Sequence, residues 1–185
     1  MKELSLNILD IAMNSVKAKA SLIEILIDET ADTLTLTIKD NGYGMKSDFL
    51  TNVTNPFSTT RTTRKVGLGL PFLRLEAEMT GGCMDISSKH IDDYPNSHGT
   101  VVTAKFFKNH IDYTPLGDVV STVTTLVQGS PDIDFVFRHT TQNGSVELDT
   151  RDVRSVLGAD IPINSIEVIR WIADSLNCDY SELNM

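Results

Sequence analysis

The spacing of apolar and polar residues in the first part of the chain predicts a helix followed by a β-hairpin. Residues 3–20 have apolar side chains at steps of three and four, which predicts an amphipathic helix with a stripe of Leu6, Leu9, Met13 and Val16. Residues 22–28 are apolar and β-branched, and residues 33–39 alternate strictly. Both segments are therefore predicted strands, joined by a short turn at 29–32.

The middle of the chain continues with helices and strands around one polar segment. Residues 54–68 are rich in Thr, Arg and Gly and have almost no periodicity, which predicts a mobile loop. Pro71 suits the first turn of a helix, and Gly81-Gly82 suits its C-terminal end. The pattern predicts helices at 46–53 and 70–80 and strands at 83–88 and 99–107.

A change of composition at 109–115 marks the start of a C-terminal segment. Its pattern predicts the order αββαα, with a hairpin that turns at Asn143-Gly144. The predicted elements are helices at 116–127, 151–157 and 165–176 and strands at 134–139 and 145–149. We expect Trp171 to lie in the core. We divide the chain into a domain of residues 1–109 and a small extension of residues 110–185. The extension has no catalytic motif and is expected to pack against the first domain or a partner.

Composition and charge narrow the possible functions. Apolar residues make up 41% of the chain, which is ordinary for a globular protein with a core. The formal net charge is −9, a poor match for a nucleic-acid backbone, so we expect no nucleic-acid binding. The two cysteines share no metal-ligand spacing. No apolar run is long enough to span a membrane and no signal peptide is recognisable, so we expect a cytoplasmic protein without a membrane partner.

Two groups of residues carry candidate chemistry near the N-terminus. Asp10, Asn14 and Lys17 lie on one face of the first helix, where they can orient a water, ligate a hard cation and face a phosphate. A solvated polar face is the alternative. Asp40-x-Gly42-x-Gly44 follows a strand, where the carboxylate can accept a hydrogen bond from the exocyclic amine of a base. A glycine turn with a capping aspartate is the alternative.

A third motif, Gly67-Leu-Gly-Leu70, lies between the polar loop and the next helix. Backbone N–H groups at a helix N-terminus form an anion site, and Arg61, Arg64 and Lys65 are close in sequence. The motif follows no predicted strand and lacks the third glycine of a dinucleotide fingerprint. It is therefore not a Rossmann motif, and the chain contains no P-loop.

The order and spacing of these motifs resembles the superfamily of gyrase, heat-shock chaperone, histidine-kinase and mismatch-repair ATPases. The resemblance covers about residues 3–107 and includes an N box at 10–17, a G1 box at 40–45, an F box and ATP lid at 55–64 and a G2 box at 67–70. His98-Gly-Thr100 fits the start of the final strand of this family. The resemblance implies an α+β fold, a two-layer α/β sandwich of the histidine-kinase-type ATPase (Bergerat) fold.

The resemblance also implies Mg²⁺ and ATP as cofactors and assigns roles to individual residues. Asn14 would ligate Mg²⁺, Lys17 would face the phosphates, and Asp40 would bind the adenine amine. The remaining residues implied in nucleotide binding are Gly42 and Gly44 in the base pocket, Phe57 near the lid hinge, Thr59, Thr60, Arg61 and Arg64 in the lid, Gly67, Gly69 and Leu70 in the phosphate-side loop, and Met45, Leu68 and Thr100 within the matched motifs.

Two departures from the family pattern leave two functions open. Asp10 stands where many members have a glutamate as the general base, and no histidine precedes Asn14. We expect each of His90, His98, His110 and His139 to be a surface or packing residue, and no autophosphorylation on histidine. The first interpretation is a stand-alone regulatory kinase or slow ATPase that acts on a partner protein in signal transduction. The second is an ATP-gated switch that binds a partner with little turnover.

Overall fold

The computed structural model describes residues 3–53, 69–158 and 160–183. Within them the helices are α1 (Leu4–Lys17), α2 (Ser47–Val53), α3 (Gly69–Met79), α4 (Val119–Gly129), α5 (Thr150–Leu157) and α6 (Ile166–Leu183). The strands are β1 (Leu22–Glu29), β2 (Thr33–Asp40), β3 (Cys83–Lys89), β4 (Gly99–Phe107), β5 (Asp134–Thr141) and β6 (Gly144–Asp149). Elements differ from the predicted ranges by a few residues at their ends, except α6, which extends well beyond residue 176.

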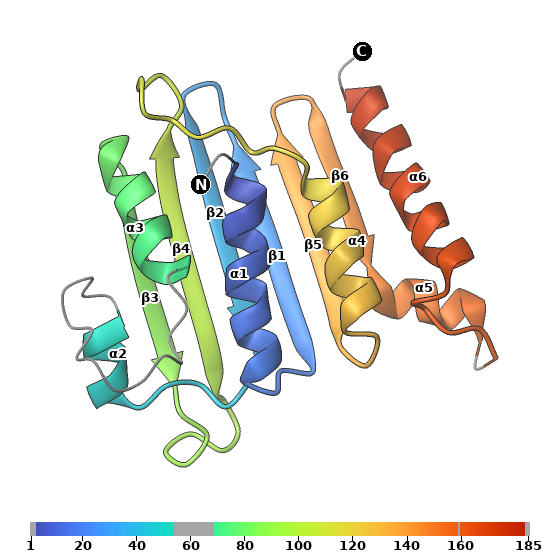
Figure 1. Ribbon diagram of the computed structural model, residues 1–185, viewed down its shortest axis with the longest axis horizontal. Helices are drawn as coiled ribbons and strands as arrows, with labels where there is room; N and C mark the ends of the chain where they lie inside the picture. Colours follow the sequence, from blue (N-terminus) through green and yellow to red (C-terminus); the bar gives the residue numbers. More distant parts are fainter. Residues whose placement is uncertain (1–2, 54–68, 159, 184–185) are drawn as a thin grey trace.

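The strands form one sheet in the order β3-β4-β2-β1-β5-β6 (Figure 1). Neighbouring strands are antiparallel except β1 and β5, which pair in parallel with Ile25 opposite Phe137. The predicted boundary at residue 109 falls between β4 and α4. Because β5 and β6 continue the sheet begun by β1–β4, strands from both sides of this boundary belong to one sheet.

Helices cover one face of the sheet, which confirms the predicted two-layer α/β sandwich. Figure 1 shows α1, α3 and α4 side by side over this face, with α6 beside β6. Alternate side chains of β1 and β2 point into the layer between sheet and helices and are almost fully buried: Ile23, Ile25, Ile27, Leu34, Leu36 and Ile38. The strict alternation in the sequence thus reflects one buried and one partly exposed face.

The buried face of α1 differs from the predicted stripe. Leu6 and Met13 are 44% and 37% exposed, whereas the residues that face the sheet are Leu4, Ile8, Ile11, Ala12 and Ser15. The helix has apolar residues at helical spacing on two faces, and the sequence pattern suits either one. The backbone N–H groups of Leu4 and Ser5 donate hydrogen bonds to the carbonyl oxygens of residues 115 and 116. These bonds help to fix which face of the helix points toward the sheet.

The prediction that Trp171 lies in the core is wrong, because its side chain is 57% exposed. The buried stripe of α6 consists of Val168, Ile172 and Leu176. Residue 171 lies about 100° around the helix from residue 172, so burying one neighbour turns the other outward. Two consecutive apolar residues of a helix cannot both lie on one narrow buried stripe.

The C-terminal segment packs closely on the rest of the molecule. Its elements follow the predicted order αββαα. The turn between β5 and β6 is Gln142-Asn143, one residue before the predicted Asn143-Gly144, because Gly144 already pairs with Thr141 in the sheet. The Thr122 hydroxyl on α4 donates a hydrogen bond to the backbone carbonyl of Ser5 on α1. None of the helices in the described ranges combines the length and apolar content needed to cross a membrane.

Candidate functional site

Asp40 is the last residue of β2, and its carboxylate is held from two sides. The residue is only 9% exposed. Its Oδ2 accepts a hydrogen bond of 2.7 Å from the Ser15 hydroxyl on α1, and its Oδ1 accepts one of 2.9 Å from the Gly42 N–H. Both oxygens therefore have fixed positions before any ligand arrives.

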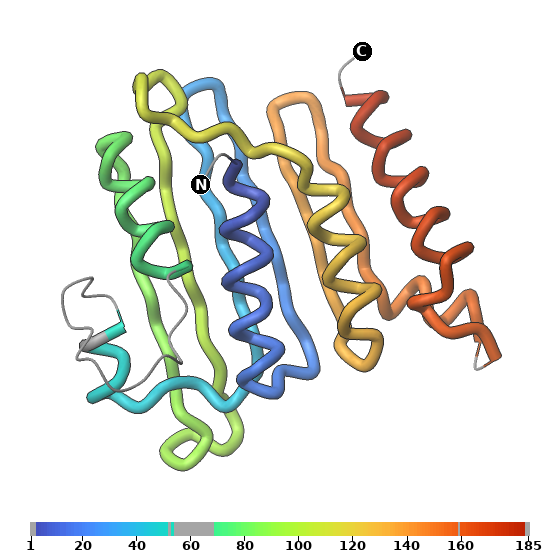
Figure 2. The backbone as a smooth tube through the Cα atoms, in the orientation of Figure 1, coloured from blue at the N-terminus to red at the C-terminus, as the bar shows by residue number. Residues whose placement is uncertain are grey.

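The glycine loop after β2 fits tightly against the C-terminal end of α1, which reaches this loop in Figure 2. A Cβ atom at Gly42 would lie 2.7 Å from the carbonyl oxygen of Ala18, so no larger residue fits there. Gly44 has φ +69°, and a Cβ atom at this position would lie 2.0 Å from the Lys89 carbonyl oxygen. Both glycines are thus required by close backbone contacts.

Residues of β3 and β4 complete the wall beside Asp40. Thr100 pairs with Asp40 across the β2–β4 ladder, and its hydroxyl lies 2.9 Å from the Ser88 hydroxyl. Ser88 Oγ also accepts a hydrogen bond from the Met45 N–H at 2.8 Å. His98 donates from Nδ1 to the Gly42 carbonyl oxygen at 2.6 Å. The loop after β2 is therefore fastened to the start of β4 as well as to α1.

The start of α3 approaches α1 at Asp10. A Cβ atom at Gly69 would lie 3.1 Å from the Asp10 Cβ and 3.4 Å from its Oδ2. Asp10 is exposed and Asn14 is half-buried, and both lie on the same face of α1 as Lys17. The distance along the helix axis from Ser15 to Asp10 is about 7.5 Å. One helix thus forms a wall shared by Asp40 and by the first residues of α3.

The structure brings together the described residues of the predicted site. Ser15 links α1 to Asp40, and the close approach of Gly69 places Asp10 at the start of α3. Gly42, Gly44, Met45 and Thr100 lie around the first contact, and Leu70 follows Gly69 at the second. Asn14 and Lys17 share the face of α1 that carries Asp10. Seven predicted residues lie outside the described ranges: Phe57, Thr59, Thr60, Arg61, Arg64, Gly67 and Leu68.

Two residues of the site were missed by the sequence analysis. Ser15 is 4% exposed and donates to Asp40, and His98 donates to Gly42. Ser15 lies on the stripe of α1 that is buried in the structure. A hydroxyl on a buried stripe needs a hydrogen-bond partner, so a correct choice of stripe would have identified Ser15 as a positioning residue.

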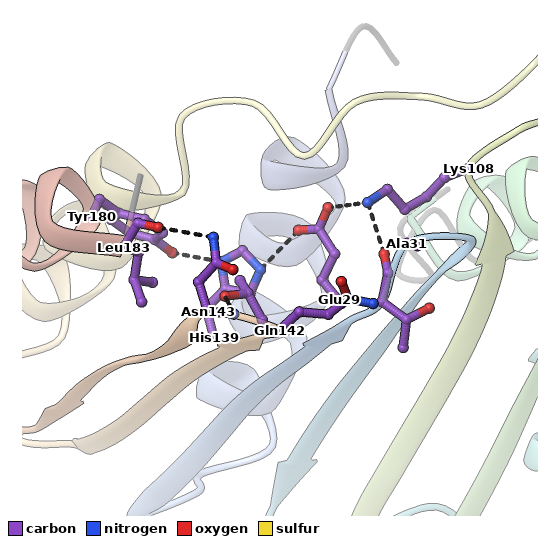
Figure 3. Close-up of a pocket in the computed structure, with 10 residues that line it drawn as sticks. Glu29, Ala31, Lys108, His139, Gln142, Asn143, Tyr180 and Leu183 are labelled. Carbon is purple, nitrogen blue, oxygen red and sulfur yellow. Dashed lines mark hydrogen bonds and ion pairs between the residues drawn. The ribbon is translucent and has the colours of Figure 1, made fainter. Parts of the chain in front are cut away.

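A second polar cluster lies at the opposite end of the β1–β2 hairpin, around a pocket of about 290 Å³ (Figure 3). His139 on β5 is 4% exposed. Its Nε2–H donates to the Glu29 carboxylate at 3.0 Å, and its Nδ1 accepts from the Tyr180 hydroxyl at 2.8 Å. Lys108 donates to Glu29 at 2.5 Å and to the Thr30 carbonyl oxygen at 2.9 Å. The cluster ties α6 to the centre of the sheet.

The electrostatics of this cluster favour a neutral histidine beside a charged glutamate. Burial lowers the pKa of His139 below its ordinary value, although the bond with Glu29 acts in the opposite direction. Burial acts to raise the pKa of Glu29, but the hydrogen bonds and charges of Lys108 and His139 outweigh it and keep that pKa low. Burial, with the charge of Glu29, raises the pKa of Tyr113 to about 12.

We expect the protein to lose stability as the pH falls below the pKa of a free histidine. The lowered pKa of His139 means that the unfolded chain binds a proton more readily than the folded one. Its contribution to stability is present above about pH 6.5 and is lost as the pH falls through the folded value. Urea unfolding at pH 7.5 and 5.5 measures this loss. His139→Gln should make the free energy of unfolding less dependent on pH. An equal pH dependence in the parent protein and the variant would show that His139 is not its source.

Residues 1–110 match a protein family described as "Histidine kinase-, DNA gyrase B-, and HSP90-like ATPase". The sensor histidine kinase YvrG of Bacillus subtilis (strain 168) is 29% identical over 101 residues. That alignment covers 51% of this chain and 16% of the kinase, so the matched half of the chain spans a small part of that relative's length.

Two solved structures share the fold. The N-terminal domain of a DNA repair protein aligns with a TM-score of 0.56 and 17% identity, over 86% of this chain and 58% of that one. The Aquifex aeolicus MutL ATPase domain complexed with ADP aligns with a TM-score of 0.55 and 15% identity, over 85% and 69%. Both alignments cover more of the chain than residues 1–110, so the shared fold includes part of the C-terminal segment.

Proposed function

Because the chain belongs to the family of histidine kinase-, DNA gyrase B- and HSP90-like ATPases, we propose that it binds Mg²⁺–ATP beside Asp40 and uses it to act on a partner protein. In this role it is a regulatory kinase or a slow ATPase. The observation that carries the proposal is the buried Asp40 carboxylate, fixed by Ser15 and Gly42 next to a glycine loop.

The Asp40 carboxylate has capacity left for the base. An ionised carboxylate has about four acceptor positions, and Ser15 and Gly42 occupy two of them. The exocyclic amine of adenine can donate to a remaining position. Guanine carries a carbonyl oxygen at the corresponding place. This oxygen and the carboxylate are both acceptors, so no proton would lie between them to form a hydrogen bond. The site is therefore expected to select ATP over GTP.

The polar face of α1 suits the phosphates and the metal. The half-buried Asn14 offers an amide oxygen, a ligand type that hard divalent cations accept. Lys17 offers a positive charge, and the first N–H groups of α3 lie beside Asp10. Bound Mg²⁺ would supply neutralisation of the phosphate charge. Asp10 would accept a hydrogen bond from the attacking water or from the hydroxyl of an acceptor protein and so orient it.

A thermal-shift experiment tests the proposed nucleotide binding. A ligand that binds only the folded state adds about 2.7 kcal/mol of stability at a hundredfold excess over its Kd. Mg²⁺–ATP should raise the melting temperature and Mg²⁺–GTP should raise it much less. Omission of Mg²⁺ should weaken the effect of ATP. An unchanged melting temperature with millimolar Mg²⁺–ATP would refute the proposal.

A switch with little turnover is the second candidate function, and Asp10 is the observation that favours it. The aspartate is one methylene shorter than glutamate, so its carboxylate lies farther from a water held near the phosphates. Single-turnover incubation with γ-labelled ATP separates the two functions. A kinase or ATPase releases or transfers the label, whereas a switch retains intact ATP. No acid-labile label is expected on the histidines of this chain.

Ser15→Ala should weaken ATP binding about tenfold, because one oxygen of the buried Asp40 carboxylate would lose its donor and the carboxylate its orientation. Calorimetric titration with Mg²⁺–ATP measures the change in Kd. Ser15→Thr retains a hydroxyl and should recover part of the affinity. Ser181→Ala, on the exposed face of α6, is the matched control. Equal Kd values for Ser15→Ala and Ser181→Ala would exclude a positioning role for Ser15.

A further inference from the structure

The negative charge of this protein is concentrated in its C-terminal segment. Residues 110–185 contain twelve Asp and Glu residues against four arginines and no lysine, a formal net charge of −8. Residues 1–109 contain thirteen Asp and Glu residues against twelve Lys and Arg, a net charge of −1. The charge asymmetry is unrelated to the Asp40 site and requires its own explanation.

Large apolar side chains are exposed within the same acidic segment. Val156 at the end of α5 is 86% exposed, Ile166 at the start of α6 is 62% exposed, and Trp171 is 57% exposed. Ile161, in the connection between the two helices, is 49% exposed. These four side chains occur within sixteen residues of sequence, on α5, on the first turns of α6 and on the connection between them, and we call this region the α5–α6 surface. Single exposed apolar residues are common, but a local group that includes a tryptophan is typical of a binding surface.

Carboxylates lie among these apolar side chains. At 100° per residue, the exposed Glu167 and Asp174 project from α6 between the directions of Ile166 and Trp171, together with Arg170. Within the described ranges, neither Glu167 nor Asp174 forms an ion pair, and the same holds for Asp152 and Asp160 around Val156 and Ile161. The surface therefore combines apolar anchors with carboxylates that form no ion pair within the described ranges.

The position of the α5–α6 surface leaves it accessible. Figure 1 shows α5 and the start of α6 at one corner of the molecule, away from α1 and α3, which form the wall of the Asp40 site. Helix α6 buries only its opposite stripe against the rest of the protein. A partner can therefore contact this corner without blocking the nucleotide site.

We propose that the α5–α6 surface docks a basic, amphipathic segment of a partner protein. Such a segment would place apolar side chains against Val156, Ile166 and Trp171 and lysines or arginines against Glu167 and Asp174. A nucleic acid is excluded by charge repulsion. The inference names the kind of partner for the proposed function, but docking needs no nucleotide, so the two can fail separately.

Trp171 is the single tryptophan of the chain and provides the signal for a direct test. The probe is a synthetic amphipathic peptide with leucines on one helical face and lysines on the other, added without nucleotide. Docking should shift the Trp171 emission to shorter wavelength and protect the ring from acrylamide quenching. A shuffled peptide of the same composition and an acidic analogue with glutamates in place of the lysines should do neither. Added salt should weaken binding.

Variants show whether this surface carries the binding. The double variant Val156→Ser/Ile166→Ser and the double variant Glu167→Gln/Asp174→Asn should each weaken binding of the basic peptide about tenfold, a loss of the order of one well-buried contact. Ile111→Ser replaces a 94% exposed isoleucine outside the surface and should leave the Kd unchanged. An equal response to shuffled and amphipathic peptides, or an unchanged Kd in both double variants, would overturn the proposal. Retained ATP stabilisation in these variants would show that the nucleotide site is intact.

Discussion

Asp40→Asn is expected to weaken Mg²⁺–ATP binding about 100-fold, the largest loss of affinity of any single substitution considered for this protein. The substitution removes a charge-assisted hydrogen bond to the adenine amine, and such bonds contribute about 1.5–3 kcal/mol. It also introduces an amide N–H₂ group that can point at another donor. Because 1.4 kcal/mol corresponds to a factor of ten in Kd, the loss approaches two orders of magnitude.

The fold should tolerate this substitution. Asparagine has the shape of aspartate, and its carbonyl oxygen can still accept from the Gly42 N–H, while the Ser15 hydroxyl can rotate to accept from the new amide. The melting temperature without nucleotide should therefore change little, whereas the ATP-dependent shift should disappear. Asp85→Asn, on the exposed face of β3, is a matched control that should retain the full shift. Similar ATP affinities for the two variants would show that Asp40 does not read the base.

The elements that the sequence predicts well are those in which a single periodicity is unambiguous. The hairpin of β1 and β2 shows strict alternation, and Asn143-Gly144 locates the turn between β5 and β6 to within one residue of the observed Gln142-Asn143. The glycines of the candidate site were also predictable. Their spacing relative to Asp40 reflects backbone contacts with Ala18 and Lys89 that exclude any side chain.

Other features depend on contacts between distant segments, which the local pattern does not contain. Helix α1 has two apolar faces, and only the packing of its neighbours selects the one that includes Ser15. The parallel pairing of β1 with β5 joins residues more than a hundred positions apart. Neighbouring residues 171 and 172 are both apolar, and the burial of Ile172 determines the exposure of Trp171.

The polar cluster of Glu29, Lys108, His139 and Tyr180 illustrates the same limit. Its members come from β1, the residue after β4, β5 and α6. No two of them are close in sequence, so neither spacing nor motif could have suggested the cluster. His139 was expected to be a surface or packing residue, and the structure places it inside β5, buried between Glu29 and Tyr180.

Asp10→Asn is expected to lower the turnover of ATP about 100-fold while leaving the affinity for ATP almost unchanged. Removal of a general base typically costs between 10² and 10⁴ in rate. Asp10 is exposed on α1 and meets the start of α3 at Gly69, so asparagine of the same size should fit without strain. Steady-state release of phosphate and calorimetric Kd values measure the two quantities separately.

The comparison of Asp10→Asn with Asp10→Glu and Asp40→Asn distinguishes the two candidate functions. If Asp10 orients the attacking water or hydroxyl, asparagine lowers turnover about 100-fold at unchanged affinity. Glutamate instead preserves or raises turnover, because its carboxylate reaches about one methylene closer to the phosphates. Asp40→Asn instead lowers affinity and should recover turnover at high ATP concentration. If both Asp10 variants bind ATP normally and hydrolyse it as slowly as the parent protein, the residue takes no part in the reaction. ATP would then act by stabilising one conformation of the protein, as expected of a switch.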